Sequence, residues 1–291
     1  METLTGLLKK GQEILVQAGI EEAGLDARLL LEYITGKSRA YYLAHGEECV
    51  TKETADRYLE LVTGRSQHIP LQHLTHQAFF MGYEFYVNED VLIPRQDTET
   101  LVEEALRLLK GRQKPRVLDM CTGSGCILTS ILLEVPDASG TGADLSEKAL
   151  KVAACNARRL QTADRAEFVK SDLFSSEYFS GSVYDVLISN PPYIPTEEIE
   201  GLMEEVRLHD PRMALDGKAD GLYFYRAITK QAMDYMLPGG WLLYEIGWDQ
   251  GKAVKELLDK EGFINIEIKK DLCGLDRVVL GQKSLQEEQN V

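Results

Sequence analysis

The sequence predicts an α/β protein: a mainly parallel sheet, covered by helices on both faces, that follows a small helical domain. After residue 115 the chain alternates short apolar strands with amphipathic helices, which is typical of parallel sheets. The first 75 residues carry helical apolar patterns instead. Between these regions, residues 77–93 are rich in aromatic and β-branched side chains around a central glycine, and this pattern indicates a β-hairpin.

The composition is that of a globular protein. Of the 291 residues, 44% are hydrophobic and 27% are charged, and this length allows one large domain and one small one. No apolar run approaches the roughly 20 residues of a membrane span, and the N-terminus lacks the pattern of a secretory signal. The five scattered cysteines form no disulfide framework. We therefore expect a cytoplasmic protein with no membrane partner.

The formal net charge is −15. A chain this acidic is repelled by phosphate backbones unless basic residues are concentrated locally, and the basic groups of this sequence are short. Direct binding of nucleic acid is therefore not expected. The acids at Glu197, Glu198, Glu200, Glu204 and Glu205 are interpreted as a solvated helix face; the alternative is that they rim the entrance for a substrate.

The helical and α/β regions define the expected domains. Residues 1–75 form an N-terminal helical domain, 76–96 a linking β-hairpin, 97–283 the catalytic domain and 284–291 a frayed tail. The strands expected in the sheet are 116–119, 140–144, 166–170, 184–189, 241–246, 263–268 and 277–280. The helices expected between them are 98–110, 125–134, 146–159 and 249–260.

A loop containing two glycines follows the first of these strands. Residues 119–125, Asp-Met-Cys-Thr-Gly-Ser-Gly, lead directly into a helix. Glycines at such a turn let the backbone approach a ligand, and the helix N-terminus directs free N–H groups toward it. A dinucleotide fingerprint is disfavoured because Leu128 occupies the position of its third glycine, and a P-loop because no Gly-Lys-Ser/Thr follows.

Acidic residues end the next two strands. Asp144 lies about 20 residues beyond the loop, where an acid can accept both hydroxyls of an adenosine ribose; its alternative role is a helix N-cap. Asp172 could accept from the adenine amine, with Leu173 and Phe174 beside the ring; the alternative is packing at a strand end. Because open α/β sheets bind ligands at the carboxyl ends of their strands, these groups suit S-adenosylmethionine.

The fourth strand runs into Asn190-Pro191-Pro192-Tyr193. The prolines fix φ and lack N–H donors, so nearby carbonyls are not drawn into a helix. A rigid turn is the simpler interpretation, since Asn-Pro turns are common. The position at a strand end, downstream of the glycine loop, favours a functional loop.

This four-residue motif resembles that of methyltransferases acting on planar nitrogens, including adenine N6 and glutamine side-chain amides. Nearly the whole chain resembles one branch, the peptide chain release factor glutamine methyltransferases (HemK/PrmC family). Two positions depart from the family's pattern. Cys121 stands where the family has the first glycine of the motif, and residues 96–99 are Gln-Asp-Thr-Glu where the family more often has Pro-Glu-Thr-Glu. The segments that carry the resemblance are 69–73, 80–82, 91–95, 118–127, 171–174, 189–195, 220–222 and 245–247.

The resemblance implies a class I S-adenosylmethionine-dependent methyltransferase fold, with a Rossmann-like seven-stranded sheet, a small N-terminal helical domain and a linking β-hairpin. It implies methyl transfer from S-adenosylmethionine to the side-chain N5 of the glutamine in the Gly-Gly-Gln loop of a peptide chain release factor. The N-terminal domain is expected to recognise that protein. The expected catalytic residues are Asn190, Pro191, Pro192 and Tyr193, and no metal is expected. The expected cofactor-binding residues are Asp119, Cys121, Thr122, Gly123, Ser124, Gly125, Asp144, Leu145, Asp172, Leu173 and Asn190.

An amide nitrogen is a poor nucleophile, because its lone pair is delocalised into the carbonyl. We expect the Asn190 side-chain oxygen and the Pro191 carbonyl to accept its hydrogens, and the Tyr193 ring to pack against the amide plane. Such orientation, with fixed dipoles matched to the transition state, lowers the barrier without a dedicated base.

Three other functions remain open. The target could be a glutamine of another translation protein. Adenine N6 methylation of nucleic acid uses the same four-residue motif, although the net charge opposes it. A binding module that retains the cofactor pocket as a scaffold is opposed by the intact Asn190–Tyr193 loop.

Overall fold

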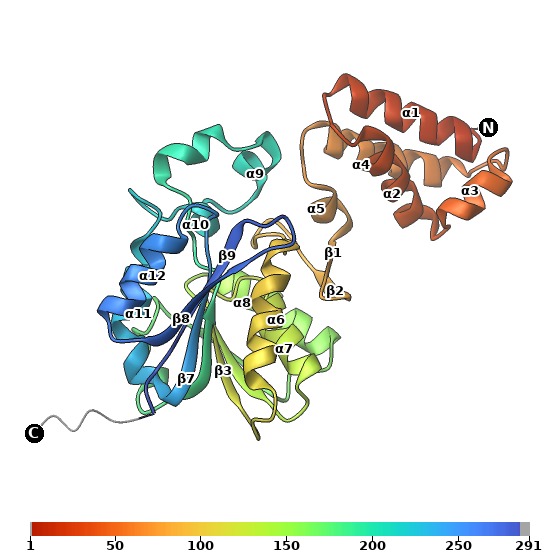
Figure 1. The fold of residues 1–291 in the computed structure, drawn as a ribbon. Helices are drawn as coiled ribbons and strands as arrows, with labels where there is room; N and C mark the ends of the chain where they lie inside the picture. The colour runs from red at the N-terminus through yellow and green to blue at the C-terminus, as the bar shows by residue number, and fades with distance from the viewer. Residues whose placement is uncertain (1, 286–291) are drawn as a thin grey trace, which may run out of the picture. The chain divides into compact units, whose positions relative to one another are not determined.

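The computed structural model describes residues 2–285 (Figure 1). It divides into two compact units: Met1–Gln77 with Met203–His209, and the rest of the chain. The β-hairpin therefore belongs to the second unit. Residues 203–209, expected within the catalytic domain, group with the N-terminal helices. Residues 286–291 of the expected tail lie outside the described part of the chain.

The first unit is helical. The Thr3 and Thr51 side chains cap the first and fourth helices by accepting the backbone N–H groups of Gly6 and Thr54. The apolar helix faces meet in a core that includes Leu7, Leu15, Leu30, Leu31, Tyr58 and Val62. The helices are α1 (Leu4–Gln17), α2 (Ala23–Thr35), α3 (Arg39–His45), α4 (Lys52–Ser66), α5 (Leu71–Thr75) and α9 (Glu204–His209).

A buried arginine connects α9 to this core. Arg65 Nε donates to Asp26 Oδ2 at 2.7 Å, and Arg65 Nη2 lies 3.0 Å from Glu205 Oε2. His68 Nε2 lies 3.7 Å from Glu204 Oε2. The interpretation as a solvated face is therefore wrong for Glu205, which is half-buried and paired with Arg65, whereas Glu204 is exposed as expected, beside His68.

The second unit contains the expected seven-stranded sheet, with strand order β5-β4-β3-β6-β7-β9-β8. All pairs from β5 to β7 are parallel, and β9 is antiparallel to both of its neighbours. The chain order reverses beside β3, between β4 and β6. The strands are β3 (Arg116–Met120), β4 (Ser139–Asp144), β5 (Ala166–Lys170), β6 (Tyr184–Ser189), β7 (Met236–Glu245), β8 (Ile264–Lys270) and β9 (Asp276–Gln282).

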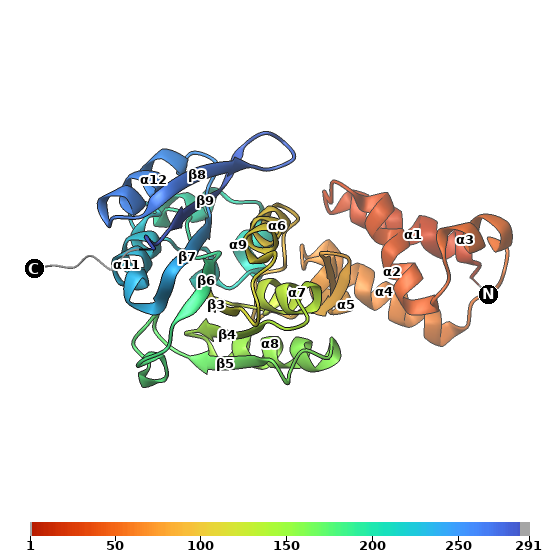
Figure 2. The ribbon, with the colours of Figure 1, turned by 60° about the horizontal axis from the view of Figure 1, so that its bottom comes forward.

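Helices cover both faces of this sheet (Figure 2). One face carries α6 (Asp97–Leu109), α7 (Cys126–Glu134) and α8 (Glu147–Arg159), and the other carries α11 (Tyr223–Ala232) and α12 (Gly251–Lys260). The remaining elements are the hairpin β1 (Gln77–Phe80) and β2 (Tyr83–Tyr86), the helix α10 (Arg212–Leu215), and short 3₁₀ helices at Glu177–Phe179, Thr196–Gly201 and Met233–Tyr235.

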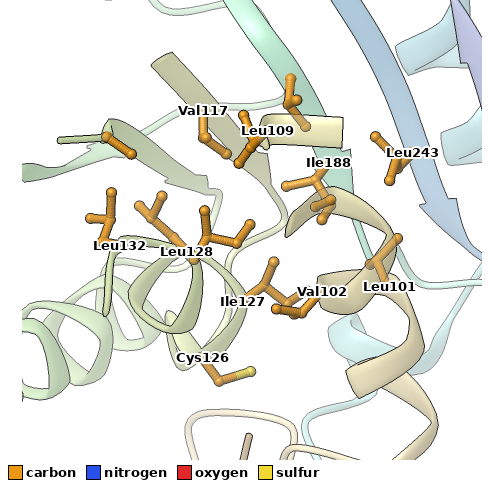
Figure 3. Packing of buried hydrophobic residues seen from close by; sticks show 14 of the residues in the cluster. Leu101, Val102, Leu109, Val117, Cys126, Ile127, Leu128, Leu132, Ile188 and Leu243 are labelled. Carbon is orange, nitrogen blue, oxygen red and sulfur yellow. The ribbon is translucent and has the colours of Figure 1, made fainter. Parts of the chain in front are cut away.

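The core beneath α6 and α7 is shown in Figure 3. Leu101 and Val102 of α6 and Ile127 of α7 pack over Val117 and Ile188 of the central strands. Strands β3 and β6 are nearly continuous apolar runs, which suits them to burial on both faces of a parallel sheet. This packing fixes the strand ends that form the site.

The sequence analysis does not anticipate α3, α5, α10 or α11. All five cysteines are free. Within residues 2–285, no helix combines the length and apolarity needed to cross a membrane.

Candidate active site

A cavity lies at the carboxyl ends of β3, β4 and β6, where the chain order of the sheet reverses. This is the position at which open α/β sheets bind ligands. The expected site residues that line it are Cys121, Thr122, Gly123, Ser124, Asp144, Leu145, Asp172, Leu173, Asn190 and Pro192. The structure thus brings three separate sequence segments and the proline loop to one cavity.

The loop after β3 adopts a conformation that favours glycine. Cys121, Gly123 and Gly125 have φ values of 63°, 54° and 74°, in the left-handed region. At Gly125 an added Cβ would also lie 2.9 Å from the Ala153 Cβ on α8. Gly125 does not line the cavity, contrary to its expected role. It instead allows α7 to begin close against α8.

Asp144 is tied to the backbone through both carboxylate oxygens. Oδ2 accepts the Gly123 N–H at 2.9 Å, and Oδ1 accepts the Ser146 N–H at 2.9 Å. Burial raises the pKa of Asp144, while these hydrogen bonds lower it. The N-cap of α8 is Ser146, whose hydroxyl accepts the Ala149 N–H, so the alternative role of Asp144 as N-cap is wrong. The fixed carboxylate retains lone pairs for a ligand in the cavity.

Asp119 is fully buried and does not line the cavity. Its Oδ2 accepts the Thr122 hydroxyl at 2.6 Å. Among the described residues its Oδ1 has no hydrogen-bond partner, and burial raises the pKa of Asp119 to about 7. Asp119 therefore holds the cavity residue Thr122 in place. The geometry does not support the expected direct contact between Asp119 and a cofactor.

Beyond β5, the expected adenine-binding segment is divided. Asp172 and Leu173 line the cavity. Phe174 is buried instead and stacks on Tyr235, with ring centroids 4.3 Å apart and planes at 4°. The expectation that Phe174 flanks an adenine ring is wrong, because its side chain completes the core on the α11 face.

The loop after β6 is also divided between cavity and core. Asn190 and Pro192 line the cavity, whereas Pro191 and Tyr193 do not. The Tyr193 hydroxyl donates to Glu245 Oε1 at 3.3 Å, and its backbone oxygen accepts from Gln250 Nε2 at 2.9 Å. Burial raises the pKa of Tyr193. Its ring packs against the core, so Tyr193 anchors the loop and does not offer its ring to the cavity.

Several lining residues were not expected, among them Arg95, Thr98 and Phe224. Arg95 Nη2 donates to Asp210 Oδ2 at 2.8 Å. Arg95 lies in the segment 91–95, so the sequence held a signal for it. Nothing in the sequence indicates that Thr98 at the start of α6 or Phe224 in α11 reaches the cavity. Within residues 2–285, no group of His, Cys, Asp or Glu side chains is arranged to hold a metal ion.

Two family models match the chain in succession. The PrmC N-terminal domain matches residues 6–75, and the methyltransferase small domain matches residues 97–209. A release factor glutamine methyltransferase from Clostridium acetobutylicum is 37% identical over 94% of this chain and 96% of that protein. The same named enzyme from Caulobacter vibrioides is 37% identical over 97% of each chain.

Among solved structures, the hMettl16 catalytic domain in complex with an MAT2A 3'UTR hairpin has a TM-score of 0.58 to this chain. It is 13% identical and covers 90% of this chain and 94% of that one. This likeness concerns the fold alone.

The seven-stranded sheet, the cavity at its switch point and the matched domains define a methyltransferase of the class I architecture. More specifically, the chain belongs to the release factor glutamine methyltransferase family, as its identity over nearly the whole length of these relatives shows. The fold and family expected from the sequence are confirmed.

Proposed function

We propose that this protein transfers a methyl group from S-adenosylmethionine to the side-chain N5 of the glutamine in the Gly-Gly-Gln loop of a peptide chain release factor. The observation that carries the proposal is the position of Asn190 on the wall of the cavity, beside the glycine loop, in a chain whose relatives are named for this reaction. An amide side chain there suits a planar NH₂ acceptor.

The residues of the cavity fit S-adenosylmethionine. Asp144 would accept the ribose hydroxyls, Asp172 the adenine amine, and Leu173 would contact the ring. An added Cβ at Gly123 would meet no atom within 4 Å, so the loop backbone is open to a ligand beside it. Bound there, S-adenosylmethionine supplies a methyl group activated by a sulfonium charge.

The protein's task is to make the glutamine nitrogen reactive. The Asn190 oxygen and the Pro191 carbonyl would accept the two N–H hydrogens and direct the nitrogen lone pair into the cavity. As the nitrogen gains a methyl group it develops positive charge, which these oxygens stabilise. Fixed acceptors that need no reorganisation during the reaction are effective in this role, and orientation alone can account for about 7–11 kcal/mol of a barrier. The methylated nitrogen is acidic enough to lose its proton to water, so no general base is assigned.

We also propose that the N-terminal helices recognise the protein substrate. The cavity is lined by residues of the second unit alone, so the core of the first unit is not required to build it. A domain that chemistry does not need is suited to docking a macromolecule. The proposed site of action is the cytoplasm, where release factors work.

An acceptor assay with labelled S-adenosylmethionine tests this function. Purified release factor should become labelled, and a release factor whose loop glutamine is replaced by alanine should not. A ribosomal protein and adenine-containing DNA and RNA oligonucleotides serve as competing acceptors. Labelling of an oligonucleotide, or of release factor independently of the loop glutamine, would contradict the proposal.

A further inference from the structure

We propose that Thr98 and Glu245 are positioning residues that orient the Asn190 amide with its oxygen toward the substrate. The inference rests on the proposed function, in which that oxygen accepts an N–H from the glutamine. Neither residue belongs to the Asn-Pro-Pro-Tyr motif. They come from two other elements, the first turn of α6 and the last residue of β7.

The Asn190 amide can serve the reaction in one of two orientations. Rotation by 180° exchanges its oxygen and its NH₂ group, which have nearly the same shape and opposite hydrogen-bonding roles. With the NH₂ group toward the substrate, two donors would face each other and the nitrogen would not be held. The surroundings of Asn190 therefore have to distinguish its oxygen from its nitrogen.

Thr98 is the immediate neighbour that can do this. Asn190 Nδ2 donates to Thr98 Oγ1 at 3.3 Å, and Thr98 is buried, with 3% of its surface exposed. A hydroxyl can accept or donate, so by itself it would tolerate either face of the amide. It selects the NH₂ group only if its own proton is committed to another acceptor.

Glu245 is that acceptor. Glu245 is buried, with 2% of its surface exposed, and its Oε1 accepts the Tyr193 hydroxyl. Oε2 is buried and has no hydrogen-bond partner in the described part of the chain, so it is an acceptor still in need of a donor. The Thr98 hydroxyl is close enough to lower the pKa of Glu245 by hydrogen bonding. Because an ionised carboxylate only accepts, a Thr98 proton directed to this carboxylate would leave the Thr98 lone pairs for the Asn190 NH₂ group, which is the contact observed.

The three residues are held together by the sheet. Asn190 directly follows β6, and β6 is paired with β7 up to Ser189 and Tyr244, so Asn190 and Glu245 come from neighbouring strand ends. Helix α6 packs on these strands (Figure 1) and brings Thr98 to both side chains. The alignment is therefore part of the core and does not require a ligand.

The charge on Glu245 depends on several neighbours. Burial raises its pKa to about 7, whereas Arg277 of β9 and the Thr98 and Tyr193 hydroxyls lower it, and Asp97 of α6 raises it. The Tyr225 hydroxyl of α11 donates to the Glu245 backbone oxygen. Protonated Glu245 could donate to Thr98, which would then donate to the Asn190 oxygen and reverse the amide. Turnover should therefore fall as the pH falls through about 7.

The first test compares Thr98→Val with Thr98→Ser in the full-length protein, with intact release factor as the acceptor. Valine keeps the shape and removes the hydroxyl, whereas serine keeps the hydroxyl. We expect Thr98→Val to lower kcat by about tenfold or more, with little change in the Kd of S-adenosylmethionine measured by calorimetry, and Thr98→Ser to restore most of the turnover. If Thr98 had a purely structural role, Thr98→Val would change the Kd and the melting temperature together with kcat.

The second test uses Glu245→Gln, which is the same size and carries an NH₂ group able to donate to Thr98. We expect a lower kcat and loss of the decline in kcat that the wild type shows below about pH 7. Wild-type kcat in Thr98→Val, or an unchanged pH profile in Glu245→Gln, would overturn the positioning role while leaving the methylation itself intact. If the wild-type protein itself did not methylate release factor, the proposed function would be wrong, and this inference would fall with it.

Discussion

Asp119 and Asp144 stand at the ends of neighbouring parallel strands, yet only Asp144 reaches the cavity. The sequence predicts that both strands end at the same edge of the sheet, and the structure confirms it. It could not distinguish the two carboxylates, because the distinction depends on where the chain turns. After Met120 the backbone is left-handed at Cys121, and the Thr122 hydroxyl bonds to Asp119, whereas Asp144 is the last residue of its strand.

The tethered Asp144 leads to a prediction about cofactor affinity. Asp144→Ala should weaken binding of S-adenosylmethionine by about 1.5–3 kcal/mol, the range for a hydrogen bond to a charged group, measured by calorimetry. The matched control is Thr51→Ala, which removes the side-chain N-cap of α4, away from the cavity, and should lower stability with little effect on affinity. Unchanged affinity in Asp144→Ala would assign the carboxylate to tethering the loop alone.

Asn190 supports a prediction about turnover. Asn190→Ala removes one preorganised acceptor, so kcat should fall by about two orders of magnitude or more, while calorimetry should find S-adenosylmethionine binding largely intact. Steady-state turnover near that of the wild type would contradict the amide-holding mechanism.

At the scale of elements, one side chain of α8 joins the hairpin to the glycine loop. Asn156 is fully buried. Its Oδ1 accepts the Tyr86 N–H at 2.7 Å, and its Nδ2 donates to the backbone oxygens of Tyr86 and Ser124 at 3.0 Å and 2.9 Å. Strand β2 and the loop after β3 are far apart in the sequence, so this amide is what ties both to one helix.

Replacing that amide should destabilise the second unit. Asn156→Ala removes all three of these buried hydrogen bonds, and loss of a buried hydrogen-bond partner costs about 1–3 kcal/mol. The free energy of unfolding from urea titration should fall by about that amount. Arg158→Ala, on the exposed side of the same helix, is the control and should change it by less than about 0.5 kcal/mol. Equal effects of the two variants would show that the bridging amide is dispensable.

Helix α11 shows what sequence patterns can conceal. Its buried residues Tyr225, Ile228, Thr229 and Ala232 follow helical spacing, so the signal was present. The segment also begins with aromatic residues and contains β-branched ones, which favour strands. Packing against the sheet decides in favour of the helix. By contrast, the strands of the sheet were predictable because their burial on both faces leaves continuous apolar runs.

At the scale of the whole molecule, the two regimes of the sequence correspond to two units, but the division is not a single cut in the chain. The helix α9 has no buried residues and is held to the first unit by ion pairs with Arg65 and His68. Apolar periodicity reports burial, and it carries no information about charge pairs between residues far apart in the sequence. This is why the sequence analysis assigned α9 to the catalytic domain.

Arg65 is the residue through which this division can be tested. Its side chain is 9% exposed, and removing one partner of a buried ion pair typically costs about 3–5 kcal/mol. In Arg65→Met, amide hydrogen exchange should quicken together in residues 2–77 and 203–209, while the strands of the sheet keep their protection. Arg57→Ala, on the exposed face of α4, should change neither. Faster exchange throughout the sheet would contradict the division.

The same variant tests the proposed recognition role. If the first unit docks the release factor, Arg65→Met should lower kcat/KM for the intact factor while leaving turnover of a short Gly-Gly-Gln peptide near that of the wild type. Steady-state kinetics with both acceptors would measure this. Equal losses on both acceptors would mean that the unit acts through stability alone.

The pairing of Arg65 with Glu205 also has a consequence for the order of events during synthesis. The ribosome releases the first unit's five leading helices early, but α9 follows only after β3, β4, β5 and β6 have been made. Until then the Arg65 guanidinium has Asp26 but lacks Glu205. We therefore expect the first unit, although most of it is translated first, to finish folding late, once most of the catalytic sheet has left the exit tunnel.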